Sequence, residues 1–118
     1  MKTTILIFFV ILSFVSFAQK PKDGIYTYKI AFAEHNGQSL GATCTIIIKG
    51  DKIKVIHNGN RNLTGKKGDI LDQGIILKHK SGKWIIGHSK KDKNASEIGG
   101  CSDGPQIIDF KHRIFRMC

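Results

Sequence analysis

Short runs of alternating apolar and polar residues, punctuated by glycine, cover most of the chain beyond residue 24. In the first run, over 25–34, Tyr26, Tyr28, Ile30 and Phe32 alternate with polar or smaller side chains. Alternation with a period of two is typical of a β-strand that buries one face. We therefore predict a strand here, with the four large side chains toward the core. No window has a sustained helical period, and only a short helix around 91–97 is indicated.

The clearest unit is a hairpin formed by 43–49 and 52–58. Glycine as the first of the two loop residues, Gly50-Asp51, favours a type II′ turn. Three pairs then face each other on the core side: Ile48 with Ile53, Ile46 with Val55, and Cys44 with His57. The opposite face carries Lys49, Lys52 and Lys54.

The rest of the chain continues this pattern. We predict a short strand over 69–73 that ends at Gly74, and a hairpin of 75–80 with 83–88 around Ser81-Gly82. In that register Leu77 faces Ile86 and His79 faces Trp84. Its outer face carries three more lysines: Lys78, Lys80 and Lys83.

A last pair of strands, 106–110 and 113–118, closes the chain. Their pairing through Lys111-His112 places four apolar residues together: Ile108, Phe110, Phe115 and Met117. Two polar loops, 59–68 and 89–104, separate the hairpins. Seven or eight short strands at this spacing predict an all-β fold, either an antiparallel meander closed into a small barrel or a sandwich. The strand pattern, and nothing else, is similar to that of lipocalins and avidins.

The first 18 residues have the three parts of a secretory signal peptide. Lys2 precedes an apolar run over 5–15, and Ser16-Phe17-Ala18 gives a small-x-small cleavage site. The run is shorter than the 18–20 or so residues that span a bilayer, and no later segment is apolar for long enough to do so. We expect cleavage after Ala18 and export, to the periplasm or the medium in a bacterium. Residues 19–118 then form a single β-rich domain.

Export makes a disulfide plausible because the chain meets oxidising conditions. Of the three cysteines, Cys44 points toward the predicted core, Cys101 lies in a loop and Cys118 points outward. We predict a Cys101–Cys118 disulfide and a free Cys44. Pairing of Cys44 with Cys118 is the alternative, because the first and last strands meet in a closed barrel.

The candidate chemical motifs are weak. Gly37–Gly41 matches G-x-S-x-G, but Ser39 would need a strand-to-helix turn, and here another strand follows. Cys44 and His57 face each other, as a nucleophile and its base would, or as two metal ligands. No third partner is visible, so we predict no metal and no cofactor. A small hydrolase or thiol enzyme is therefore the opposing function class.

Charge is the best functional clue. Without Lys2, 18 Lys and Arg residues face nine Asp and Glu residues, a net charge of +9. We predict a non-enzymatic binding protein whose basic surface attracts an anionic polymer, a lipid headgroup or an acidic protein. The six lysines of the two hairpins form that surface: Lys49, Lys52, Lys54, Lys78, Lys80 and Lys83. Nucleic acid is disfavoured because the few aromatic residues are committed to the core.

The alternative is a carrier with an apolar interior pocket for a small ligand near Tyr26, Tyr28 and Trp84. Asn62 and Asn94 begin N-x-S/T triplets, which would accept glycans in a eukaryotic secretory pathway.

Overall fold

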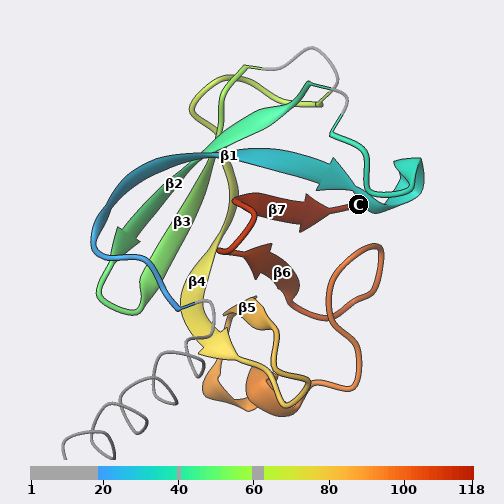
Figure 1. The fold of residues 1–118 in the computed structure, drawn as a ribbon. Helices are drawn as coiled ribbons and strands as arrows, with labels where there is room; N and C mark the ends of the chain where they lie inside the picture. The colour runs from blue at the N-terminus through green and yellow to red at the C-terminus, as the bar shows by residue number, and fades with distance from the viewer. Residues whose placement is uncertain (1–18, 40, 60–62) are drawn as a thin grey trace, which may run out of the picture.

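The structure is a computed structural model that describes residues 19–39, 41–59 and 63–118 (Figure 1). The predicted signal peptide and Asn62 lie outside the described residues. The only helical segments within these ranges are two short 3₁₀ turns, η1 (Ala33–His35) and η2 (Lys90–Asn94). None of the helical segments described has the length and apolar character needed to cross a membrane.

Seven strands form a closed barrel in which each strand pairs with the next one along the chain. They are β1 (Gly24–Phe32), β2 (Thr43–Lys49), β3 (Lys52–His57), β4 (Ile70–Lys78), β5 (Trp84–Gly87), β6 (Gln106–Asp109) and β7 (Ile114–Met117). All consecutive pairs are antiparallel, whereas β7 closes the barrel against β1 in parallel. The parallel pair follows from the odd number, because seven strands that alternate in direction leave the first and last pointing the same way. The predicted all-β meander barrel is confirmed, and the sandwich is not formed.

The β2–β3 hairpin has the predicted register, with Cys44 opposite His57 and Ile48 opposite Ile53. Gly50 makes the turn at a φ of +63°, which lies in the left-handed region that glycine enters without a steric penalty. The predicted C-terminal register is also confirmed, since Ile108 lies opposite Phe115.

The predicted register of the β4–β5 hairpin is wrong by one residue. Ile76, rather than Leu77, lies opposite Ile86, and Lys78 lies opposite Trp84. The connection spans five residues, 79–83, instead of two. Across it, the N–H of His79 donates a hydrogen bond to the carbonyl of Lys83 at 2.8 Å. A slip of one residue moves every side chain of a strand to the other face. Lys78 therefore leaves the outer lysine row and joins the side on which Trp84 lies.

The predicted strand end at Gly74 is also wrong, because β4 runs through it without a break. A Cβ atom at residue 74 would lie 2.2 Å from the carbonyl oxygen of Gly87 on β5. Glycine thus allows a close approach of two backbones here, a role that Gly can have inside a strand.

The barrel interior is filled by side chains. Tyr28, Ile46, Ile86 and Phe115 are each at most 2% exposed, and they belong to one continuous hydrophobic cluster. A Cys101–Cys118 disulfide, the predicted pair, ties the loop after β5 to the end of β7. Cys44 remains a free, buried thiol.

Candidate functional site

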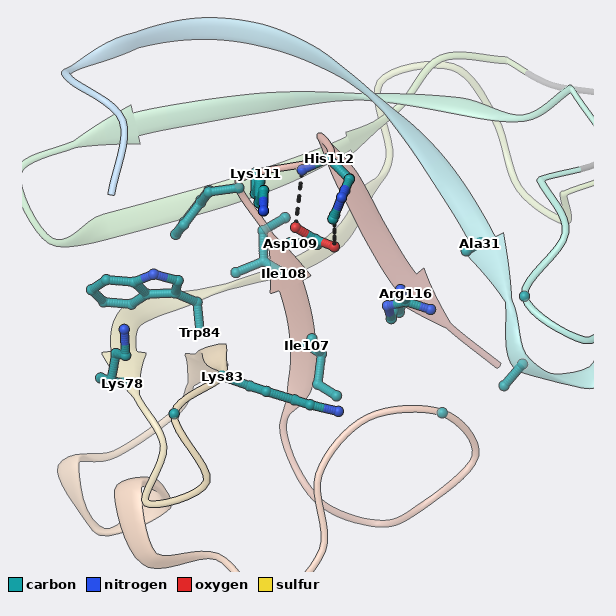
Figure 2. Close-up of a pocket in the computed structure, with 15 residues that line it drawn as sticks. Ala31, Lys78, Lys83, Trp84, Ile107, Ile108, Asp109, Lys111, His112 and Arg116 are labelled. Carbon is teal, nitrogen blue, oxygen red and sulfur yellow. Dashed lines mark hydrogen bonds and ion pairs between the residues drawn. The ribbon is translucent and has the colours of Figure 1, made fainter. Parts of the chain in front are cut away.

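A pocket of about 670 Å³ lies beside β5, β6 and β7. Its apolar lining includes Trp84 on β5 and Ile107 and Ile108 on β6 (Figure 2). Phe110, just after β6, also lines it. Adjacent strands bring these residues together: Ile85, the neighbour of Trp84, pairs with Ile107. Because β5 and β6 are each four residues long, the pocket is built close to where these strands end.

Trp84 is fixed by two ring contacts. Its indole meets the Phe110 ring edge-on, with the ring centroids 5.7 Å apart. The Nζ atom of Lys78 lies 4.8 Å from the centroid of the indole ring, a cation–π arrangement. The corrected β4–β5 register is what creates this contact, because it places Lys78 directly opposite Trp84. The ammonium of Lys78 is therefore held at the pocket.

The pocket is strongly basic. Four side chains that carry a full positive charge line it: Lys78, Lys83, Lys111 and Arg116. Figure 2 shows them on different sides, with Lys78 and Lys83 near Trp84, Lys111 at the β6–β7 turn, and Arg116 on β7. Asp109 supplies the one carboxylate in the lining. The cations are therefore in clear excess, and each comes from a different position along the chain.

Asp109 is already occupied within the protein. Its carboxylate accepts hydrogen bonds from the backbone N–H of His112 at 3.0 Å and from the His112 ring Nδ1 at 2.8 Å. Burial would raise the pKa of Asp109, but the His112 hydrogen bonds and the charges of His112 and Arg116 outweigh burial, and the net shift is downward. Asp109 thus stays ionised, shapes the β6–β7 turn and offsets one of the four positive charges in the lining.

The structure separates the six predicted surface lysines. Lys78 and Lys83 line the pocket, whereas Lys49, Lys52 and Lys54 line a different groove on the β2–β4 side. Lys80 lines neither of the two. The single basic surface that the sequence predicts is therefore at least two sites.

The three aromatic residues predicted to surround a ligand do not line one pocket, although the rings of Tyr26 and Tyr28 lie 6.4 Å apart between centroids. Tyr28 is 2% exposed within the core, and the hydroxyl of Tyr26 donates a hydrogen bond to the Lys22 carbonyl. Neither tyrosine lines the pocket, and only Trp84 does. The pocket beside Trp84 is thus a concave surface near β5, β6 and β7, and the barrel interior beside Tyr28 is filled.

Cys44 and His57 are directly opposed, but their surroundings are those of a core. Both are at most 1% exposed, and burial raises the pKa of the Cys44 thiol to about 12. The His57 Nδ1 accepts a hydrogen bond from the Gly59 N–H at 2.6 Å. A neutral, inaccessible thiol is a poor nucleophile, so this pair gives no support to a thiol enzyme.

Ser39 likewise has a structural role in the described residues. Its hydroxyl donates a hydrogen bond to the carbonyl of Ala42 at 3.0 Å, and β2 follows at once. The strand-to-helix turn of a hydrolase nucleophile is not formed there. Residues 19–39, 41–59 and 63–118 contain no group of three or more His, Cys, Asp and Glu side chains placed to hold a metal ion.

Ile107, Lys111 and Arg116 are pocket residues that the sequence did not identify. Lys111 was predicted only as part of the turn in the C-terminal hairpin, and no function was predicted for Ile107 or Arg116. The signal that could have joined them to Trp84 is the closure of the barrel, which pairs β5 with β6. Comparison with protein-family models, with curated proteins and with solved structures finds no match to this chain. Function must therefore be inferred from the geometry of the site.

Proposed function

We propose that the protein is an exported, non-enzymatic binding protein for an anionic polymer, and that the pocket beside Trp84 receives the polymer's anionic groups. The observation that carries the proposal is the ring of Lys78, Lys83, Lys111 and Arg116 around an apolar wall. Charges of one sign that line a concave surface focus the electrostatic potential and concentrate counter-ions there.

The placement of the cations favours a partner with several negative groups. They stand on separate sides of the pocket rather than at one point (Figure 2). A lone carboxylate or phosphate could contact only some of them. Three of the four are lysines, whose compact, flexible ammonium groups suit repeated charges better than the planar, bidentate recognition that arginine provides.

A small organic anion is the second candidate. The pocket volume of about 670 Å³ lies within the range of roughly 300–1,000 Å³ that is common for small-molecule sites. Trp84, Ile107 and Phe110 would contact its apolar part. This version keeps the predicted small-ligand carrier but moves its site from the barrel interior to the pocket.

The test uses Trp84, the chain's single tryptophan, as a fluorescent reporter inside the site. Dextran sulfate should change its emission, with an affinity that falls steeply as salt rises, and uncharged dextran should leave it unchanged. Benzoate, a small aromatic carboxylate, distinguishes the second candidate: saturation by benzoate with little salt dependence would favour the small-ligand site.

Matched variants locate the binding. Lys83→Gln with Lys111→Gln removes two pocket charges and should weaken dextran sulfate binding several-fold, at roughly two- to five-fold for each solvated charge. Lys90→Gln with Lys91→Gln removes the same charge outside the pocket lining and should have a much smaller effect. Equal losses in both double variants would mean that net charge alone attracts the polymer, and would overturn the pocket as its site.

A further inference from the structure

A second basic feature lies on β2, β3 and β4, and its lining shares no residue with that of the pocket. It is a groove of about 520 Å³ that contains the three lysines of the first hairpin. Its described lining is Ile47, Lys49, Lys52, Ile53, Lys54, Gln73, Gly74 and Ile75. We call the groove, together with the adjoining Ile25, the β1–β4 outer patch.

Isoleucines and lysines share the outer patch, and Lys49 pairs with Lys52 within it. Ile25 pairs with Ile47, and Ile47 pairs with Lys54 on the next strand. One row further, Lys52 pairs with Ile75. Ile25 is 74% exposed and Ile47 is 37% exposed, so these are large apolar side chains left in water. Aliphatic side chains therefore stand beside ammonium groups over one sheet face.

The groove lining includes no carboxylate. Acidic residues lie beside it at the hairpin end, where Asp23 accepts a hydrogen bond from the Gly50 N–H at 2.8 Å and Asp51 forms part of the turn. Lys20 adds a cation at the same end, because its Nζ donates to the Gly50 carbonyl at 2.5 Å. Asp72 also adjoins the groove, since its carboxylate accepts a hydrogen bond from the N–H of Gln73. The groove itself thus presents three positive charges that no lining acid offsets.

We propose that the β1–β4 outer patch docks on a lipid bilayer that carries anionic headgroups. Its lysines would meet the phosphates, and its isoleucines would enter the boundary between headgroups and acyl chains. A protein partner fits less well, because the groove lining lacks Trp, Tyr and Arg, the residues that dominate protein–protein hot spots. This membrane contact is a property additional to polymer binding in the pocket.

The experiment is vesicle co-sedimentation with the full exported chain. Vesicles of phosphatidylcholine alone are compared with vesicles that contain an equimolar share of phosphatidylglycerol. Binding is expected only to the anionic vesicles. Lys49→Gln, Lys52→Gln and Lys54→Gln together should weaken it roughly a hundred-fold, given the contribution of each basic residue near an anionic surface. Ile25→Ser with Ile47→Ser, which keeps the charge, should weaken it roughly ten-fold.

The matched control is Lys90→Gln, Lys91→Gln and Lys93→Gln, which removes the same charge from η2 and should leave most binding intact. An equal loss in this control, or no preference for anionic vesicles, would overturn the proposal; binding to an acidic protein instead would do the same. The outer-patch variants should keep the response of Trp84 to dextran sulfate. A failure of membrane docking is thereby distinguishable from a failure of the pocket function.

Discussion

The Cys101–Cys118 disulfide should contribute a large share of the stability of this small barrel. The two cysteines are 17 residues apart in sequence, and the bond encloses β6, β7 and the turn between them. Cys101→Ser with Cys118→Ser removes this restraint from the unfolded chain. The folded barrel keeps its remaining core contacts, because Cys101 and Cys118 are both exposed.

The size of the effect follows from the loop length. In the chain-entropy model, opening a 17-residue loop lowers the free energy of unfolding by about 3 kcal/mol at 25 °C. For a domain of this size, that loss corresponds to a fall in Tm of roughly 10–20 °C. It is a substantial part of the roughly 5–15 kcal/mol by which small domains are stable.

Urea unfolding, followed through the fluorescence of Trp84, measures this loss directly. The variant should unfold at a lower urea concentration, and the native protein measured with a reductant should match it. A difference below about 1 kcal/mol would refute the reasoning, since the loop would then restrain the unfolded chain far less than its length requires.

The same variant should weaken dextran sulfate binding. Gly100, the neighbour of Cys101, lines the pocket together with Arg116, which lies two residues before Cys118. The disulfide therefore holds two segments of the pocket wall against each other. If the folded double-serine variant bound dextran sulfate as tightly as the native protein does, the pocket would not depend on this disulfide.

Three further outcomes are expected. Cys44 should not react with a thiol reagent until the protein unfolds, and rapid labelling of the folded protein would contradict its burial. Because burial raises the pKa of Cys44 to about 12, the free energy of unfolding should also fall as pH rises above the ordinary thiol pKa toward that value. Gly74→Ala should lower the free energy of unfolding in urea by about 1–3 kcal/mol, since the new Cβ meets a backbone oxygen at 2.2 Å. The control Gly24→Ala should be nearly neutral, because its Cβ has ordinary contacts from 3.4 Å. Equal effects of the two variants would refute the close approach of β4 and β5 at Gly74. Because the pKa of Asp109 is lowered in the folded protein, its ionised form stabilises the fold above the ordinary carboxyl pKa, and this contribution is lost as pH falls through the lower, folded value. Asp109→Asn should therefore make Tm less sensitive to acid. A dependence of Tm on pH identical to that of the native protein would contradict this prediction.

Local patterns were sufficient for most of the fold. Alternation in β1 and the Gly50-Asp51 turn predicted the core face and the register of the first hairpin, because a two-residue loop leaves no freedom in the pairing. The C-terminal register was also predicted correctly, although residues 110–113, rather than two residues, connect β6 to β7. The parallel orientation of the β1–β7 pair that closes the barrel was not predicted, since it depends on the total number of strands.

The second hairpin shows where the sequence is ambiguous. Ser81-Gly82 resembles a two-residue turn, but the connection is five residues long and shifts the register by one. Leu77 and Ile76 are both apolar, so alternation does not choose between them. The pocket depends on this choice, because the shift is what brings Lys78 against Trp84. The candidate site was therefore less predictable than the fold around it.

The most direct test of the anion pocket is a nuclear magnetic resonance titration of isotope-labelled protein with dextran sulfate fragments. The account predicts the largest shifts at the Trp84 indole N–H and at the backbone amides of Lys83, Ile107, Lys111 and Arg116, all of which line the pocket. Shifts centred on Lys49, Lys52 and Lys54, or spread evenly over all basic residues, would contradict it.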